Sequence, residues 1–357
     1  MMKVGIIGLP QSGKMTLFEI LTGNKRKDGV PLSKATPGSA DILDARFDAL
    51  VSMYEPEKSA RARIDLVLLP KMEPETIARG DIFRDIVDMD AICHVVRAFE
   101  DESVYHVDGS VDAVRDMDMV NAELLIHDQI FVEKRVERLE KALRKIKDEA
   151  QQKELALMHR MLAHLEGERP LRMMAMDADD EALIRSYPFI TRKEMVLALN
   201  IGEDDIGTAP IAGEILTRCE AQRMKAMQVS AKVESEIAML DTDEEKKEFM
   251  EDLGISEMAL ETLTRLCLEA LGLVSFFTVG KDEVRQWLVR RNSPAPVAAG
   301  VIHSDLQRGF IRAEVMKYEE LMACGDEAVL KKAGKMYLNG KEYIVEDGDI
   351  LNIRFKV

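Results

Sequence analysis

The sequence predicts an α/β protein built on a parallel sheet, with an inserted helical hairpin and a separate β-rich domain at the end. Short apolar runs alternate with helical stretches, as in a parallel sheet that helices cover on both faces. Two middle stretches carry apolar residues at helical spacing, and the last part of the chain shifts toward strands and turns. The predicted sheet strands are Val4–Ile7, Ile64–Leu69, Ala91–Val96, Met195–Leu199 and Met227–Val229.

The first of these strands leads into a glycine-containing loop that resembles a phosphate-binding loop. The pattern G-x-x-x-x-G-K-[ST] is met except at its last position. Its glycines allow a tight turn with backbone N–H groups facing phosphate oxygens, and a helix that favours anions follows. We therefore expect a nucleotide's phosphates to bind at Gly8, Pro10, Gln11, Ser12, Gly13, Lys14, Met15 and Thr16.

The residue that fails the pattern is Met15, which stands where a hydroxyl normally holds magnesium. A thioether is a poor ligand for a hard cation. Thr16 is one residue further along the helix, so its side chain is rotated by about 100° and should point away from the metal position. The loop therefore predicts no direct magnesium ligand.

The middle of the chain predicts two antiparallel helices. One apolar series is Val132, Val136, Leu139, Leu143 and Ile146, and the second is Leu155, Met158, Leu162 and Leu165. Charged residues fill the gaps, and the polar stretch Lys147–Gln152 is the expected bend. The pattern fits two packed helices with solvated outer faces as well as an arm that binds a partner.

The C-terminal part predicts a small separate domain. Glu283–Leu288, which carries Trp287, is expected to be helical. Lys335–Val345 predicts two strands joined at Asn339-Gly340, and Ile350–Phe355 predicts a final strand.

Composition limits the classes of protein that fit. The net charge of −16 argues against a general nucleic-acid-coating protein, although a local basic face is compatible with it. Four well-separated cysteines fit reduced thiols in a cytoplasm. The chain opens on an apolar strand, which predicts no signal peptide, and no apolar run is long enough to span a membrane.

Five further blocks of the sequence are distinctive: Asp90–Asp101, Val229–Glu234, Ala299–Asp305, Arg308–Val315 and Glu346–Phe355. Together they resemble the YchF family, the Obg-like ATPases of the translation-factor P-loop class. The resemblance implies a P-loop G-type domain over 1–119 and 190–276, a coiled-coil-like hairpin over 120–189 and a β-grasp TGS domain over 277–357.

The resemblance also implies a base-recognition site. The family carries N-x-x-E where GTPases carry N-K-x-D, and Asn200, Ile201 and Glu203 follow the fourth predicted strand in that pattern. The Asn200 amide is expected to bridge to the phosphate loop or to the base edge. Ser230, Ala231 and Lys232 match the segment whose backbone N–H typically caps the base. We therefore expect ATP to be preferred, with GTP remaining possible.

The chain departs from the family at the metal site. In register from Pro56, Leu68 replaces the aspartate of D-x-x-G and Lys71 replaces its glycine. The nearest carboxylate, Asp65, lies three residues earlier, and Thr36 is the only threonine in the eroded stretch Leu32–Asp41. Mg²⁺ is therefore doubtful as a cofactor, and hydrolysis is expected to be weak or lost.

The leading hypothesis is a cytoplasmic nucleotide-binding regulator associated with ribosomes. Two alternatives are an active ATPase with unconventional metal support and a nucleotide-free scaffold. Basic residues after Gly280 fit RNA contact or ordinary solvated charge, and the resemblance favours ribosome or RNA binding through the TGS domain and hairpin. His303 and His94 are expected to be structural. The basic residues are Lys281, Arg285, Arg290, Arg291, Arg308, Arg312, Lys335, Lys341, Arg354 and Lys356.

Overall fold

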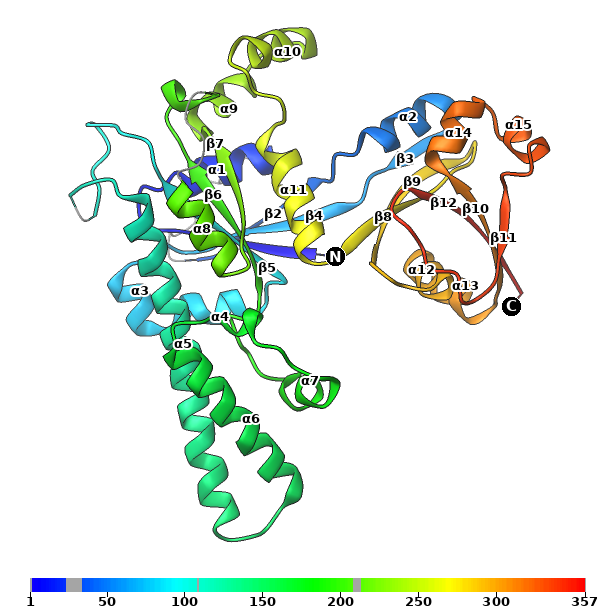
Figure 1. Ribbon diagram of the computed structural model, residues 1–357. Coiled ribbons are helices and arrows are strands. Elements are labelled where there is room, and N and C mark those ends of the chain that lie inside the picture. The colour runs from blue at the N-terminus through cyan, green and yellow to red at the C-terminus, as the bar shows by residue number, and fades with distance from the viewer. Residues whose placement is uncertain (1, 24–33, 108, 208–212, 357) are drawn as a thin grey trace. The chain divides into compact units, whose positions relative to one another are not determined.

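The computed structural model describes residues 2–23, 34–107, 109–207 and 213–356 (Figure 1). Backbone contacts divide the chain into two compact units. The first unit comprises Met1–Ala40 with Asp65–Leu263, and the second comprises Asp41–Ile64 with Thr264–Val357. Among the described residues, none of the helices combines the length and apolar character that a membrane span requires.

The first unit contains a six-stranded sheet in the order β2-β4-β1-β5-β6-β7. The pairs β1–β5, β5–β6 and β6–β7 are parallel, as predicted. All five apolar runs lie in strands of this sheet, because buried β-branched residues fit a sheet that is covered on both faces. The strands are β1 (Met2–Ile7), β2 (Thr36–Asp41), β4 (Arg63–Leu68), β5 (Ala91–Arg97), β6 (Glu194–Asn200) and β7 (Lys225–Val229).

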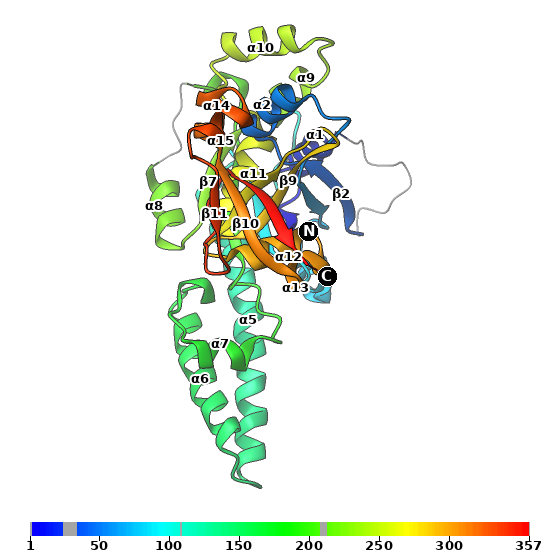
Figure 2. The same ribbon diagram turned by 90° about the vertical axis from the view of Figure 1, so that its right-hand side faces the viewer.

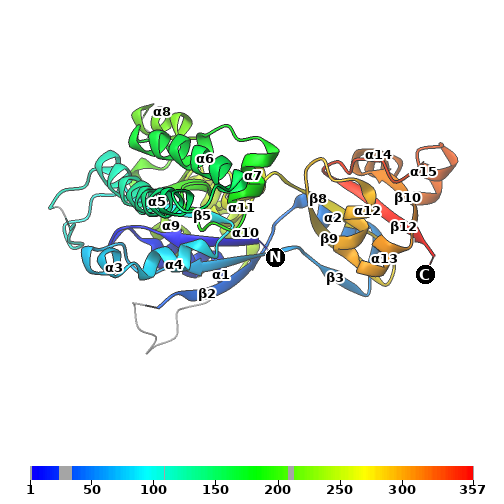
Figure 3. The ribbon, with the colours of Figure 1, turned by 90° about the horizontal axis from the view of Figure 1, so that it is seen from below.

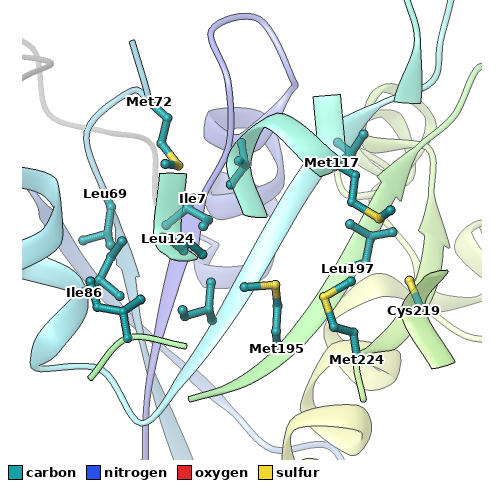
Figure 4. Packing of buried hydrophobic residues seen from close by; sticks show 14 of the residues in the cluster. Ile7, Leu69, Met72, Ile86, Met117, Leu124, Met195, Leu197, Cys219 and Met224 are labelled. Atoms are coloured by element: carbon teal, nitrogen blue, oxygen red, sulfur yellow. The ribbon is translucent and has the colours of Figure 1, made fainter. Parts of the chain in front are cut away.

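Helices of the first unit bury one face of this sheet in a continuous apolar cluster. Figure 4 shows its side chains, with Met117 and Leu124 close to Met195 and Leu197 of β6. The helices of the unit, apart from the hairpin, are α1 (Lys14–Thr22), α3 (Pro74–Arg79), α4 (Asp81–Val87), α7 (Ala178–Ile184), α8 (Gly213–Ala221), α9 (Ala231–Ile237) and α10 (Asp243–Asp252), with short 3₁₀ turns at Leu171–Met173 and Glu203–Asp205. Helix α11 (Ala259–Ala270) begins in this unit and ends in the second.

The predicted hairpin is formed by α5 (Ala113–Leu143) and α6 (Glu149–Glu166), which run side by side (Figure 2). Seen from below, the two helices are foreshortened and lie beside each other (Figure 3). α5 starts before residue 120 because the Asp112 carboxylate accepts a bond from the Arg115 backbone N–H, an N-cap. The Asp148 side chain caps α6 in the same way, so the bend lies at residues 144–148 and most of the expected bend, Lys147–Gln152, is helical.

The apolar stripes of the hairpin form their own cluster, which includes Val132, Val136 and Leu139 from α5. Met158 and Leu165 face them from α6. Ile146 is 73 % exposed at the bend, outside this cluster. The four-three spacing therefore marks the packed faces as far as Leu139.

The second unit has a six-stranded sheet in the order β11-β10-β12-β8-β9-β3. The pairs β8–β9, β10–β11 and β10–β12 are antiparallel. Its strands are β3 (Lys58–Ala60), β8 (Leu273–Thr278), β9 (Glu283–Arg290), β10 (Phe310–Lys317), β11 (Tyr337–Asn339) and β12 (Asp349–Phe355). Its helices are α2 (Ala45–Tyr54), α12 (Ala295–Ile302), α13 (Ser304–Arg308), α14 (Tyr318–Cys324) and α15 (Glu327–Lys332).

Two local predictions for this unit are wrong. Glu283–Leu288 is strand β9, not helix, because its burial alternates and Trp287 pairs across the sheet with Phe276, on which its ring stacks. The second strand expected after Asn339-Gly340 is absent from the described structure, where only one bridge pairs Ile344 with Pro294. The final strand is confirmed as β12.

The two units differ from the expected domains at residues 41–64 and 264–276, which were expected in the first domain and belong to the second unit. Phe47 and Leu50 of α2 are buried in one cluster with Phe277 and Val284. β3 also pairs in parallel with β9. This segment therefore completes the second unit, because its apolar face is covered by residues more than two hundred positions later in the chain.

Candidate functional site

The loop between β1 and α1 is held in a tight conformation that requires glycine. Gly13 has φ +86°, and a Cβ there would lie 2.1 Å from Asn200 Nδ2. A Cβ at Gly8 would lie 2.5 Å from the Val95 carbonyl oxygen. Both glycines are therefore needed for backbone approach, as the motif predicts.

Lys14, the first residue of α1, points its ammonium into the loop. Its Nζ donates to the carbonyl oxygens of Gly8, at 3.0 Å, and Pro70, at 2.8 Å. The side chain is 7 % exposed. Burial, together with the positive charge of Lys71, lowers the pKa of Lys14 to about 7, although Glu73 acts in the opposite direction. The loop thus holds a cation that lacks a bonded carboxylate.

The loop encloses a cavity of about 190 Å³, which we call the loop pocket. The predicted phosphate-binding residues lie on it, except Gly8, whose carbonyl accepts from Lys14. Leu68 and Lys71, the two replacements in the D-x-x-G stretch, also line it. Its lining residues are Leu9, Pro10, Gln11, Ser12, Gly13, Lys14, Met15, Thr16, Lys34, Leu68, Leu69 and Lys71.

The donor set of the loop pocket does not fit magnesium. Mg²⁺ requires hard oxygen ligands in octahedral geometry, yet the described lining residues include no carboxylate. Met15 contributes a thioether and Leu68 a hydrocarbon side chain. Asp65 lines a different hollow, with Lys3 and Asp88, so it does not replace the missing aspartate. The described part of the chain holds no group of three acidic, histidine or cysteine ligands.

A second cavity of about 660 Å³ adjoins the first, and we call it the side pocket. Gly13 and Thr16 line both cavities. Thr16, which was expected to point away from the metal position, therefore lies where the two cavities meet. The six residues expected at the base all line the side pocket: Asn200, Ile201, Glu203, Ser230, Ala231 and Lys232.

Asn200, at the end of β6, joins the two pockets through its amide. Its Nδ2 donates to the Ser12 carbonyl oxygen at 3.0 Å, and its Oδ1 accepts from the Ala231 backbone N–H at 3.0 Å. Of the two roles left open by the sequence, the amide takes the bridge to the loop. The Ala231 N–H, expected to cap a base, is bonded to Asn200 instead. Lys232 and Glu203 form an exposed ion pair.

Two buried hydroxyls mark where a ligand would fit. Ser12 Oγ in the loop pocket and Ser230 Oγ in the side pocket have no hydrogen-bond partner among the described residues. A buried hydroxyl without a partner is costly. A polar ligand that extends through both pockets would supply both partners.

The loop that lines the side pocket at residues 99–104 was not predicted as part of the site. The buried Arg97 guanidinium donates to the carbonyl oxygens of Phe99 and Val104 and lies 4.4 Å from the centre of the Phe99 ring. These contacts fix a loop that brings Phe99, Glu100 and Val104 to the pocket. An arginine at the carboxyl end of a buried parallel strand, followed by an aromatic residue, was the available signal.

His94 also belongs to the neighbourhood of Lys14. It lies on β5, is 1 % exposed, and neither ring nitrogen has a hydrogen-bond partner among the described residues. Burial and the charge of Lys14 lower the pKa of His94 to about 3. The imidazole is therefore neutral near pH 7, which fits the expected structural role.

Glu234 lies behind the side pocket and anchors the start of α11. Its carboxylate accepts from the Ala259 backbone N–H at 2.8 and 3.1 Å. Burial raises the pKa of Glu234 to about 7, although the hydrogen bond from Ala259 opposes this. A carboxyl whose folded pKa is raised binds its proton more tightly in the folded state.

The unfolding free energy should therefore fall as the pH rises from about 4.5 to about 7. Glu234→Gln should remove this loss, which amounts to about 3 kcal/mol. Urea unfolding at about pH 5 and about pH 8 measures it. Glu236→Gln, on the exposed side of α9, is the matched control. Equal pH dependence in wild type and Glu234→Gln would contradict the shift.

Comparisons with known proteins find relatives that match this chain over almost its whole length. The family model YchF-GTPase_C, described as "Protein of unknown function (DUF933)", matches residues 273–356. The chain is 37% identical over 364 residues to the "Ribosome-binding ATPase YchF" of Bacillus subtilis, covering 99% of each. It is 34% identical over 368 residues to "Obg-like ATPase 1" of Oryza sativa, covering 100% of this chain and 92% of that protein.

A solved structure shows the same fold. It is described as the "Structure of the Schizosaccharomyces pombe YchF GTPase" and superposes with a TM-score of 0.83 at 29% identity. The match covers 99% of this chain and 97% of that one.

Proposed function

Because the chain belongs to the YchF family, we propose that it is a ribosome-associated protein that binds a nucleotide, with ATP preferred over GTP. The observation that carries the proposal is the pair of adjoining pockets, each with a buried unpartnered hydroxyl, joined by the Asn200 amide. Relatives described as ribosome-binding ATPases support both the proposed nucleotide binding and the proposed ribosome association. Such a protein acts in the cytoplasm.

In this proposal the loop pocket takes the phosphates. Backbone N–H groups at the start of α1 and the Lys14 ammonium would bind phosphate oxygens. The side pocket would take the base between Phe99 and the Ser230–Lys232 segment. Asn200 holds the two segments in register. Glutamate at position 203, one methylene longer than aspartate, disfavours the paired hydrogen bonds to guanine.

We further propose that hydrolysis is weak or absent. Magnesium would supply charge neutralisation on the terminal phosphates. Met15, Leu68 and Lys71 offer it no oxygen ligand. Losing this electrostatic support costs several kcal/mol of transition-state stabilisation, whereas binding depends more on the loop amides and Lys14.

Thermal unfolding with ATP, GTP or no nucleotide tests binding, because a ligand of the folded state raises its stability. We expect a larger shift with ATP. A turnover assay with and without magnesium tests hydrolysis, and a rate strongly stimulated by magnesium would contradict its proposed loss. Absence of any nucleotide shift would favour a nucleotide-free scaffold.

We propose that the second unit and the hairpin carry the ribosome or RNA contact. Several of the basic residues expected to bind RNA are paired with carboxylates in the structure: Arg285 with Glu283, Arg308 with Asp305, Lys335 with Glu320 and Arg354 with Glu314. These pairs reduce the local positive charge. Co-sedimentation with ribosomes over a salt series tests the proposal, and no pelleting at low salt would contradict it.

ATP affinity should depend on pH through Lys14. Burial and the charge of Lys71 lower the pKa of Lys14 in the free protein to about 7, and Glu73 acts in the opposite direction. Phosphates favour the protonated amine, so above that pH binding must take up a proton. Affinity should then fall by up to roughly tenfold per pH unit.

Calorimetry in buffers of different ionisation heat should detect the uptake of almost one proton at about pH 8. This range lies above the phosphate's own titration, at about 6. Lys232→Ala, an exposed lysine beside the side pocket, should keep the dependence. An affinity that stays constant through this range would contradict the role given to Lys14.

A further inference from the structure

The loop pocket has an unusual charge balance. Three lysines line it, Lys14, Lys34 and Lys71, and the described lining residues include no carboxylate. Both oxygens bonded to Lys14 Nζ are neutral carbonyls, those of Gly8 and Pro70. Lys71 is close enough for its charge to act on Lys14. Glu73, outside the lining, is close enough for its negative charge to act on Lys14 in the opposite direction. The charged residues of the described lining itself are all lysines, and an anion would neutralise their positive charge.

A metal-bound polyphosphate is a poor match for this lining. The ion would bring two further positive charges toward Lys71, and like charges repel most strongly where water is excluded. At positions 15 and 68 the ion would meet a thioether and methyl groups, neither of which is a hard oxygen ligand. The side-chain oxygens of the described lining are neutral ones, from Gln11, Ser12 and Thr16. A metal-free polyphosphate meets neither penalty and offers more negative charge to the lysines.

We propose that the loop pocket selects a polyphosphate free of divalent metal, with the Lys71 ammonium supplying the charge that a metal ion would otherwise provide. Lys71 is then the residue that determines specificity between the free and the metal-bound ligand. This inference rests on the proposed nucleotide binding. It implies that occupancy of the protein rises as free magnesium falls, because magnesium converts the ligand into the form that binds less well.

Calorimetric titration of ATP into the full chain tests the inference directly. One series contains excess EDTA and the other millimolar magnesium chloride, with ionic strength and pH held constant. We expect the dissociation constant to be at least roughly tenfold lower without magnesium. Inorganic triphosphate is the second probe, and the same preference for it would place the selectivity in the loop pocket.

Two substitutions separate the charge of Lys71 from its shape. Lys71→Gln should weaken metal-free ATP and bring the two dissociation constants together, whereas Lys71→Arg should retain the preference. Lys147→Gln, at the exposed bend of the hairpin, is the control for a general loss of positive charge. Melting temperatures without ligand show whether each variant is folded. The comparison of wild-type affinity with and without magnesium does not depend on any variant.

The outcomes distinguish the inference from the function on which it rests. Equal or tighter ATP binding in magnesium would overturn the inference and leave nucleotide binding in place. An unchanged preference in folded Lys71→Gln would overturn the role of Lys71. Failure of ATP to bind in either series would overturn both the inference and the proposed function.

Discussion

Lys14→Ala is expected to abolish the rise in melting temperature that ATP produces. The buried Lys14 side chain lines the loop pocket, and its ammonium is held there by the Gly8 and Pro70 carbonyl oxygens. Removing a desolvated charge that pairs with phosphate costs about 2–5 kcal/mol of binding free energy. The dissociation constant should rise by roughly 30-fold or more.

The unliganded variant should remain folded. Burying the wild-type ammonium costs desolvation free energy, and alanine does not incur this cost. Calorimetry with ATP and circular dichroism without it measure the two effects. Lys147→Ala, on the exposed bend, is the matched lysine control. Wild-type ATP affinity in folded Lys14→Ala would show that the nucleotide does not bind in this loop.

Asp128→Ala is expected to cause the largest loss of stability. The Asp128 side chain is fully buried on α5. It accepts from the backbone N–H groups of Ile190 and Thr191 at 3.0 and 2.7 Å, and from the Thr191 hydroxyl at 2.7 Å. Truncation would leave three buried donors without an acceptor, which costs about 3–5 kcal/mol in total.

Urea unfolding monitored by circular dichroism measures this loss. Asp128→Asn should be partly destabilising, because one amide oxygen remains but the NH₂ group faces donors. Glu137→Ala, exposed on the same helix, should change the unfolding free energy little. A loss below about 1 kcal/mol in Asp128→Ala would show that these bonds do not anchor the hairpin to the segment before β6.

The fold was predictable wherever the pattern is local. The strands of the parallel sheet are apolar runs long enough to identify, and the hairpin stripes mark buried faces as far as Leu139. Trp287 was misplaced because arginines interrupt β9, and its packing on Phe276 depends on a partner strand. Residues 41–64 could not be assigned, because the buried positions Phe47 and Leu50 meet residues distant in sequence.

Part of the candidate site was predictable for the same reason. The loop motif led us to expect Lys14 and its neighbours together, because phosphate-binding backbone geometry demands glycines at fixed spacing, and these residues do line the loop pocket. The sequence left two partners open for the Asn200 amide, and only the fold shows the bridge between Ser12 and Ala231. The Arg97 contacts that shape the Phe99 loop involve backbone carbonyls, which a residue pattern does not reveal.

We propose that the loop pocket binds a triphosphate without a divalent ion. This claim can be tested in a crystal structure with a non-hydrolysable ATP analogue and excess Mn²⁺, read for anomalous scattering. We predict triphosphate density along Gly8–Thr16, the Lys71 ammonium at the terminal phosphate and no anomalous peak beside Met15. An ordered metal bridging the terminal phosphates, or a pocket that remains empty of nucleotide, would contradict the claim.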